Sequence, residues 1–465
     1  MQQPMIYNRD DEAIVARCTP QGAGALALLR VSGKNALTIA DACITLLGNK
    51  NVCSQQSHTI HAGYVVNERG TKIDQVMVSI MHGPKTFTGQ DTVEVTCHNN
   101  PIIIEEILHA MIKAGARLAR NGEFTQRAFL NGKIDLTKAE AINELIHAQN
   151  QLALTKSLAQ LEGSLSSWIT TIEKVLVRAL AWSEASFEFL ENEGNFGRQI
   201  KDQITELCQT IEQIKKSFHM HKQVREGMRI AFIGSVNAGK SSLFNSLLDN
   251  ERAIVSPQAG TTRDTIEATF IINGTMATLV DTAGIRSTKN HIEAEGIKRS
   301  YQEAEQADII LLIYDSSRKF EGDEQDIYQD FLSTFLKKTI VIQNKTDLPQ
   351  QSNFDTYLKQ EGLSFIAASH DLPFTQITQA LTDKMNELTA TFEAPFLLNK
   401  RHYSLLESLE SKLRSIITML ESSPIHYELI SFHLRECLEF STELTGKSIN
   451  EAGMDTVFKE FCVGK

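Results

Sequence analysis

The chain has 465 residues, 42% of them hydrophobic, and a formal net charge of −11 at pH 7. This length suggests about three domains, and the acidic balance argues against a protein that coats nucleic acid through a basic surface. The seven cysteines form no CxxC pair, so we expect reduced thiols in a cytoplasmic protein. We see no signal peptide and no apolar run of membrane-spanning length, and so expect no membrane partner.

Residues 1–130 alternate short β-type runs with glycine-rich turns, which predicts an α+β domain. Within it, residues 25–31 and 75–80 read as strands and residues 102–114 as a helix. From about residue 135 the apolar pattern becomes helical. Thr137-Lys-Ala-Glu140 reads as a capping box that starts this region, so we predict the first part of a helical domain over residues 131–225.

Residues 389–465 resume the helical pattern and predict the second part of that domain. One apolar stripe runs through Leu405, Leu409, Leu413, Ile416 and Leu420. A second runs through Leu429, Phe432, Cys437 and Leu444, with Gly446 as the expected C-cap. Neither helical region has a partner within its own segment. We therefore expect residues 131–225 to pack against residues 389–465, with residues 226–388 inserted between them.

The inserted segment alternates apolar strands with helices, which predicts a mostly parallel sheet. The expected strands cover residues 228–233, 269–272, 277–280, 309–314, 339–342 and 365–367, with Asn273-Gly274 as a hairpin turn.

Between the first of these strands and the next helix lies Gly234-Ser-Val-Asn-Ala-Gly-Lys-Ser241, which fits the phosphate-loop pattern GxxxxGK[ST]. Backbone N–H groups of such a loop surround phosphate oxygens at a helix N-terminus. Lys240 can reach the outer phosphates, and the Ser241 hydroxyl can bind magnesium. A glycine-rich turn that matches by chance is the plain alternative, but the flanking strand and helix favour a nucleotide site.

Two further motifs narrow the nucleotide. Asp281-Thr-Ala-Gly284 ends an apolar strand with the pattern DxxG, which places a carboxylate near magnesium and a backbone N–H near the terminal phosphate. Asn344-Lys-Thr-Asp347 fits NKxD, whose aspartate accepts two hydrogen bonds from the guanine edge. In this order the motifs resemble the translation-factor-like GTPases, and GTP is the expected nucleotide.

Gly260-Thr-Thr-Arg-Asp264 is the expected first switch loop, in which Thr262 would give magnesium its second hydroxyl. Ile285 stands where Ras-like proteins carry a water-orienting glutamine. Because an isoleucine cannot align water, another residue must do so.

The whole chain resembles the MnmE (TrmE) family of potassium-dependent GTPases, which modify the wobble uridine of tRNA. The resemblance rests on the phosphate loop with its Asn-Ala-Gly-Lys-Ser-Ser run and on five further stretches: Thr19-Pro-x-Gly-x-Gly24, Arg30-Val-Ser-Gly33, Phe87-Thr-Gly-Gln-Asp91, Gly122-Glu-Phe-Thr-Gln-Arg-Ala-Phe-Leu-Asn131 and Phe461-Cys-Val-Gly-Lys465. It implies a Ras-like GTPase domain inserted in a helical domain, behind a first domain that binds tetrahydrofolate and forms a homodimer. It also implies work with the FAD-dependent partner MnmG, in which an aminomethyl or carboxymethylaminomethyl group is added to carbon 5 of the uridine.

The resemblance also assigns residues to the GTPase site. Potassium would be held by Asn237, Ser256, Gln258 and Thr261, and Glu293 would orient water for catalysis, although its plain alternative is a solvated helix-end glutamate. Lys240 and Thr262 complete the catalytic set. The full GTP-binding set is Asn237, Ala238, Gly239, Lys240, Ser241, Ser242, Ser256, Thr261, Thr262, Asp281, Thr282, Ala283, Gly284, Asn344, Lys345 and Asp347.

For the folate, which the family binds as 5-formyltetrahydrofolate or a relative, the matching residues are Arg30, Glu94, Lys133 and Lys465. A pterin needs a carboxylate and a folate tail needs cations. Cys462 is a candidate nucleophile, against the alternative of an inert small residue. It could act only if the C-terminus folds back onto the first domain.

Some positions depart from the family pattern. Asn99 and Asn100 stand where two glycines are usual, Asn121 replaces a proline, and Ala367-Ala-Ser369 replaces the last guanine-contacting motif. These changes put folate and nucleotide affinity in question. A rival interpretation is a GTP switch in ribosome assembly, similar to the Era and Der proteins, and another is a scaffold that has lost folate binding. The nitrogen donor and the tRNAs served do not follow from the sequence.

Overall fold

The structure is a computed structural model, and it describes residues 12–186, 193–216, 218, 227–250, 266–272, 275–281, 300–320, 324–369, 375–389 and 394–464. Its contacts divide the chain into two compact units. The first contains Met1–Ile146, Leu158–Ile211 and Ser404–Lys465, and the second contains His147–Ser157 and Glu212–Tyr403.

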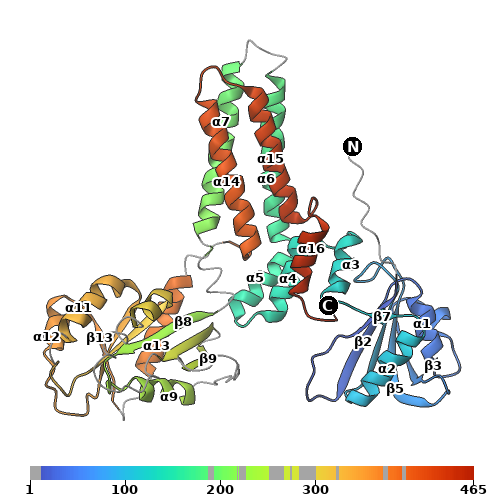
Figure 1. The fold of residues 1–465 in the computed structure, drawn as a ribbon, viewed down its shortest axis with the longest axis horizontal. Helices are drawn as coiled ribbons and strands as arrows, with labels where there is room; N and C mark the ends of the chain where they lie inside the picture. The colour runs from blue at the N-terminus through green and yellow to red at the C-terminus, as the bar shows by residue number, and fades with distance from the viewer. Residues whose placement is uncertain are drawn as a thin grey trace. The chain divides into compact units, whose positions relative to one another are not determined.

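The first unit begins with a sheet of order β3-β4-β5-β6-β2-β1-β7, whose pairings among the described residues are antiparallel except for β1 with β7 (Figure 1). Its strands are β1 (Ile14–Arg17), β2 (Leu26–Ser32), β3 (Ile44–Leu46), β4 (Thr59–Val66), β5 (Lys72–Met81), β6 (Thr92–His98) and β7 (Arg117–Leu118), with a 3-10 turn at Val52–Ser54. Helices α1 (Ala36–Cys43) and α2 (Pro101–Lys113) cover one face and close a core rich in valine and isoleucine. The strands predicted at residues 25–31 and 75–80 and the helix at residues 102–114 are confirmed.

The helical part of this unit brings together segments far apart in sequence. Its helices are α3 (Glu123–Leu130), α4 (Leu136–His147), α5 (Gln151–Glu162), α6 (Ser164–Ala185), α7 (Glu193–Lys216), α14 (Lys400–Leu420), α15 (Tyr427–Thr445) and α16 (Glu451–Lys459). Of these, α4, α5, α7 and α14 extend into the second unit. Helix α6 packs along α15 (Figure 1), where the Ser183 hydroxyl contacts the Ser431 hydroxyl at 2.8 Å and the Tyr427 carbonyl at 3.1 Å. The expectation that the two helical regions pack together is confirmed.

Two local predictions in these helices are wrong. The cap of α4 is Asp135, whose carboxylate accepts a hydrogen bond from the Lys138 backbone N–H at 2.9 Å, so Thr137 lies inside the helix. On α15, Leu429 and Phe432 are exposed, by 52% and 58%, whereas Cys437 and Leu444 are buried as predicted. The buried face follows the helical period through Tyr427, Ile430, Ser431, Leu434, Cys437, Ser441 and Leu444. Gly446 is the C-cap, as predicted, with φ of +83°.

The second unit contains a six-stranded sheet of order β13-β12-β11-β8-β10-β9 in the described residues, parallel except for the antiparallel edge strand β9. Its strands are β8 (Met228–Gly234), β9 (Ile266–Ile272), β10 (Thr275–Asp281), β11 (Ile309–Asp315), β12 (Thr339–Asn344) and β13 (Phe365–Ala367). Helices α9 (Lys240–Asn250) and α13 (Thr375–Thr389) cover one face, and α11 (Glu324–Phe335) and α12 (Phe354–Gln360) cover the other, with a 3-10 turn at Leu336–Lys338. All six predicted strands and the mostly parallel sheet are confirmed. The turn residues Asn273 and Gly274 lie outside the described residues.

Candidate functional site

The phosphate loop, residues 234–241, joins the carboxyl end of the central strand β8 to the first turn of α9. Two of its residues take left-handed backbone conformations: Asn237 has φ of +64° and Gly239 has φ of +95°. Such a run of turns points successive N–H groups toward one point above the helix N-terminus. Ser241 and Ser242 are exposed in the first turn of α9, and Ala238 is buried beneath the loop.

Lys240 is only 7% exposed, and its ammonium group bends back over the loop. Its Nζ donates to the carbonyl oxygens of Gly234 and Ser235, at 2.7 Å each. These carbonyls hold the lysine next to the space above the loop. A phosphate oxygen can replace them as its acceptor, because the charged donor then gains a charged partner.

The Asn344–Asp347 motif follows β12 at the same edge of the sheet and touches the phosphate loop directly. The Asn344 side-chain Nδ2 donates to the Ala238 carbonyl at 2.8 Å. A Cβ added to Gly239 would lie 2.0 Å from that same Nδ2 and would displace it, and the φ of +95° also favours glycine at this point of the loop. Carboxyl ends of adjacent parallel strands form the usual ligand crevice of such sheets.

Lys345 and Asp347 differ in their surroundings. Lys345, with φ of +60°, forms an ion pair with Asp315 at 2.6 Å. Burial would raise the pKa of Asp315, but the hydrogen bond from Lys345 and those from Ser317 lower it below its usual value, so the carboxyl stays ionised. The Asp347 carboxylate is exposed and has no partner among the described residues, as a group that accepts from a guanine edge requires.

A second polar cluster lies on the face of the first sheet that α1 and α2 leave uncovered. Arg30 on β2 and Glu94 on β6 are register neighbours, and their side chains form an ion pair at 2.7 Å. The Arg30 guanidinium also lies over two rings, 5.8 Å from the centroid of Phe87 and 5.4 Å from that of Phe124. Both charged groups are about one-fifth exposed, at 18% and 21%, so a ligand can reach them.

Lys133 borders the same loop as Phe87. Its Nζ donates to the Pro84 carbonyl at 2.8 Å, and a Cβ on Gly89 would lie 3.4 Å from the lysine Cδ. The structure thus joins Arg30 to Glu94 and places Lys133 at the loop that carries Phe87.

The two asparagines that replace glycines have structural partners. Asn100 caps α2 by accepting from the Ile102 N–H at 2.9 Å, and it has an ordinary φ of −113°. Asn99 donates to the Gly22 carbonyl at 2.8 Å and accepts from Arg17 at 3.0 Å. No positive φ is recorded for either residue, so this turn does not need glycine.

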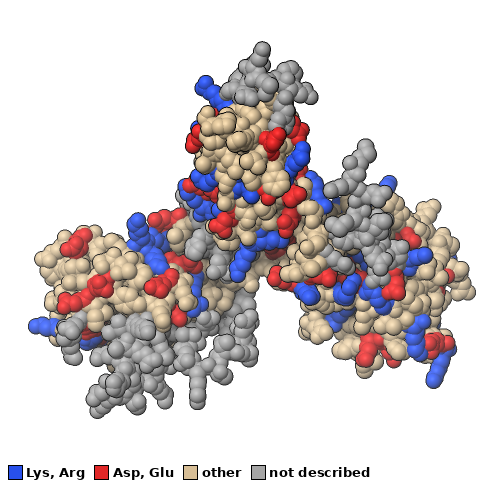
Figure 2. Space-filling view, turned by 45° about the horizontal axis from the view of Figure 1, so that its top comes forward, with Lys and Arg blue, Asp and Glu red and all other residues tan. Residues whose placement is uncertain are grey.

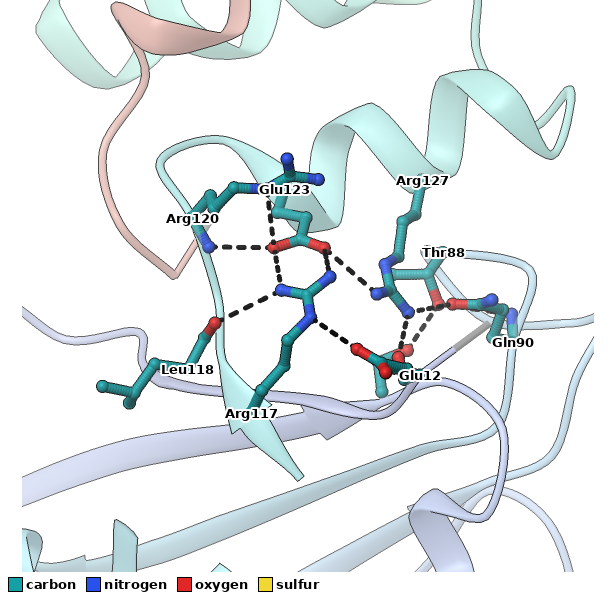
Figure 3. Close-up of polar contacts among 9 residues, drawn as sticks. Glu12, Thr88, Gln90, Arg117, Leu118, Arg120, Glu123 and Arg127 are labelled. Atoms are coloured by element: carbon teal, nitrogen blue, oxygen red, sulfur yellow. Dashed lines mark hydrogen bonds and ion pairs between the residues drawn. The ribbon is translucent and has the colours of Figure 1, made fainter. Parts of the chain in front are cut away.

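Helix α3 and the C-terminal tail lie beside this cluster. The Glu123 carboxylate accepts hydrogen bonds from the Arg117 guanidinium at 2.7 Å, from the Arg120 backbone N–H at 2.9 Å and from the Arg127 guanidinium at 3.1 Å (Figure 3). Burial would raise the pKa of Glu123, but these hydrogen bonds and charges lower it to about 2. Arg127 also donates to Gln90, which lies just before β6 (Figure 3). Our sequence analysis assigned no role to these charges, although the i, i+4 spacing of Glu123 and Arg127 on α3 is visible in the sequence.

The tail returns to the first sheet within the same unit. The Gly122 N–H donates to the Cys462 carbonyl at 3.3 Å, and Asn121 forms an antiparallel bridge with Val463. Gly464, with φ of +90°, leaves no room for a side chain, because a Cβ there would lie 2.4 Å from the Arg17 carbonyl. The exposed Cys462 therefore lies at the surface of the first domain, which meets the geometric condition for its proposed chemistry.

Comparison with known proteins decides the family. Residues 13–133 match the family described as GTP-binding protein TrmE N-terminus, and residues 136–462 match the MnmE helical domain. The chain belongs to the MnmE family. Proteins called tRNA modification GTPase MnmE are 34% identical in Flavobacterium psychrophilum, over 99% of this chain and 100% of that protein, and 36% identical in Aquifex aeolicus, over 98% and 100%. The relative in Protochlamydia amoebophila is 36% identical over 98% of both chains.

As a member of the MnmE family, the chain is a GTP-binding and GTP-hydrolysing enzyme. The matches outside the nucleotide-binding region decide against the ribosome-assembly switch. Among the helices of the described ranges, none is both long and apolar enough to cross a bilayer.

Several predicted site residues cannot be placed. Ser256, Gln258, Thr261, Thr262, Thr282, Ala283, Gly284, Glu293 and Lys465 lie outside the described residues, as do the switch segment 260–264 and Ile285. Asp281 ends β10 at the same carboxyl edge of the sheet as the phosphate loop, and only its backbone is described. Their roles, like the domain boundaries, stay predictions.

Proposed function

We propose that this protein is a potassium-dependent GTPase that works with MnmG and tetrahydrofolate to modify carbon 5 of the wobble uridine in tRNA. The observation that carries the proposal is the match of the whole chain, rather than its nucleotide-binding part alone, to proteins called tRNA modification GTPases. GTP hydrolysis would drive conformational change in the complex, and the folate would supply the one-carbon unit.

Two described residues can take part in metal binding. Ser241 is exposed in the first turn of α9, where a hydroxyl can bind magnesium beside the phosphates together with Thr262. Asn237 is exposed at the top of the loop in a left-handed conformation, and its amide oxygen suits a potassium ion shared with Ser256, Gln258 and Thr261. A monovalent cation there would stabilise charge that other GTPases stabilise with an arginine. Glu293 is the proposed water-orienting residue.

The Arg30–Glu94 pair supports folate binding. The Glu94 carboxylate can accept from an amino-pyrimidine edge, and the cations Arg30, Lys133 and Lys465 suit the carboxylates of a folate tail. In the bound state Glu94 would exchange part of its contact with Arg30 for the pterin. Cys462 would then present its thiol from the tail at the same domain.

The uncovered sheet face also supports a homodimer through the first domain. It carries Leu26, Ile60 and Met77, which are 58%, 65% and 46% exposed, around the polar pair. Exposed apolar side chains on one sheet face suit a contact with another protein surface. Figure 2 shows lysine and arginine side chains interspersed with acidic ones on the face drawn, so we propose that tRNA is contacted by local cations rather than by one basic field.

Nucleoside analysis of bulk tRNA tests the proposal. Cells that lack this protein should lose the aminomethyl and carboxymethylaminomethyl groups at the wobble uridine, and the wild-type chain should restore them. Glu94→Gln should restore them poorly, because the amide cannot replace the carboxylate, whereas the matched exposed variant Glu68→Gln should restore them fully. Intact modification in the deletion strain would remove the tRNA assignment. Full restoration by Glu94→Gln would leave a GTPase whose first domain does not use folate.

A further inference from the structure

The end of β11 and the segment that follows it belong to none of the nucleotide-binding motifs, yet they contact the phosphate loop and the Asn344–Asp347 motif. Asp315 forms the ion pair with Lys345, and the Ser316 hydroxyl donates to the Asn344 carbonyl at 2.8 Å. Arg318, two residues further on, reaches the phosphate loop. Of these three contacts, the one made by Arg318 is the one that reaches the phosphate loop.

Arg318 is held in one orientation by Glu324, the first residue of α11. Its two terminal nitrogens donate to the two carboxylate oxygens at 2.7 and 2.8 Å, which is a bidentate pair. One of these nitrogens also donates to the Ser235 hydroxyl at 3.0 Å. A guanidinium fixed by a planar two-bond pair presents its remaining donor with little loss of conformational freedom.

Ser235 is fixed at its other polar groups as well. Its N–H donates to the Tyr328 hydroxyl at 2.7 Å, and that hydroxyl donates to the Ile313 carbonyl at 2.9 Å. Its carbonyl accepts from Lys240. The N–H, side chain and carbonyl of Ser235 therefore each have a partner, and two of these partners come from α11 or the segment before it.

Lys240 is the partner that changes when nucleotide binds. When phosphate oxygens take over part of the hydrogen bonding of its ammonium, its bond to the Ser235 carbonyl weakens. Arg318 and Tyr328 then hold the hydroxyl and N–H of Ser235, beside the bond of 3.3 Å that the Ala238 N–H donates to the Ser235 carbonyl.

We propose that Arg318 is a positioning residue of the GTPase site, which acts through the Ser235 hydroxyl to hold the phosphate loop in its binding conformation. In this arrangement the terminal nitrogens of Arg318 donate to Glu324 and Ser235, so we expect the arginine to act through the loop and not by direct contact with the nucleotide. Its effect is therefore the same for GDP and GTP, and it acts on binding rather than on the chemical step.

The test is a double-mutant cycle on the full chain with Arg318→Ala, Ser235→Ala and the double variant. Arg318→Ala should weaken GDP and GTP binding alike by about ten-fold, the lower end of the range for one hydrogen bond to a charged group. KM for GTP should rise by the same factor, while kcat stays within about two-fold of wild type. The double variant should bind no more weakly than the weaker single variant, because both changes remove one contact. Lys384→Ala, which removes an exposed ion pair with Glu387 on α13, is the matched control and should bind normally.

Three results would overturn the proposal. Wild-type affinity in Arg318→Ala would show that the contact has no effect on the loop. Independent effects of Arg318→Ala and Ser235→Ala would show that the arginine acts elsewhere. A fall in kcat at unchanged KM would make Arg318 a catalytic group that meets the phosphates. If Arg318→Ala does not fold, Ser235→Ala alone must still weaken GDP and GTP equally, and unequal or absent weakening would contradict the proposal.

Discussion

Glu123 is a charged residue whose effect can be measured through pH. Only 2% of its side chain is exposed, and three arginines surround it (Figure 3). Burial by itself would disfavour the carboxylate, so the lowered pKa means that the arginine contacts outweigh desolvation. The contact links α3 to β7 and to the segment before β6, and hence the helical part of this unit to its sheet.

We predict that Glu123→Gln destabilises the first unit in a pH-dependent way. A carboxyl whose pKa falls from 4.5 to about 2 on folding stabilises the folded state above pH 4.5, and this contribution is lost as pH falls toward 2. The free energy of unfolding should therefore differ from wild type by about 3 kcal/mol at pH 7. The difference should shrink as the pH is lowered below 4.5, measured by urea denaturation.

Glu68→Gln is the control for that experiment, because Glu68 is 67% exposed and forms an exposed ion pair with Lys113. It should change the free energy of unfolding by less than about 1 kcal/mol. A difference between Glu123→Gln and wild type that stays constant from pH 7 to pH 3 would show that the charge of Glu123 does not stabilise the fold.

At the scale of elements, Gly446 fixes where α15 ends and what lies against its end. It has φ of +83°, and a Cβ there would lie 2.8 Å from the Cβ of Leu136 and 2.9 Å from the Phe129 ring. Phe129 belongs to α3 and Leu136 to α4, so three helices meet at this glycine.

Gly446→Ala should therefore lower stability through two effects. The left-handed conformation costs about 1 kcal/mol for alanine, and the clash with well-packed neighbours adds about 1–3 kcal/mol. The control is Gly115→Ala, at φ of +114° after α2 with no atom within 4 Å of the added Cβ, which should show the conformational effect alone. Equal shifts of the denaturation midpoint for the two variants would contradict the contact at α15.

The elements also show what the sequence can predict. The strands of the nucleotide-binding sheet were predicted within three residues at each end, because each contains a short apolar run, and β11 is buried along its whole length. The α15 stripe was wrong at Leu429 and Phe432, since helical spacing tolerates more than one choice of face. The capping role of Asp135 was missed because Thr137 with Glu140 offered a competing box.

Some residues of the candidate site could likewise be predicted from the sequence, and others could not. Residues of the phosphate loop and of Asn344–Asp347 were named in advance, because their chemistry depends on short local patterns. No such pattern marks Arg318, Tyr328 or Glu324. The fold brings Arg318 and Tyr328 to Ser235 and places Glu324 against Arg318. The same holds for the return of Cys462 to the first domain, which depends on contacts between residues about 340 positions apart.

For the whole molecule, the central claim is that the chain captures guanine nucleotides between the phosphate loop and the Asn344–Asp347 motif. Isothermal titration calorimetry on the full chain with magnesium tests this most directly, with GDP and ADP as the two ligands. We predict saturable binding of one GDP per chain and no measurable binding of ADP, because Asp347 accepts hydrogen bonds that an adenine edge cannot donate. Absence of GDP binding, or equal binding of the two nucleotides, would contradict the account.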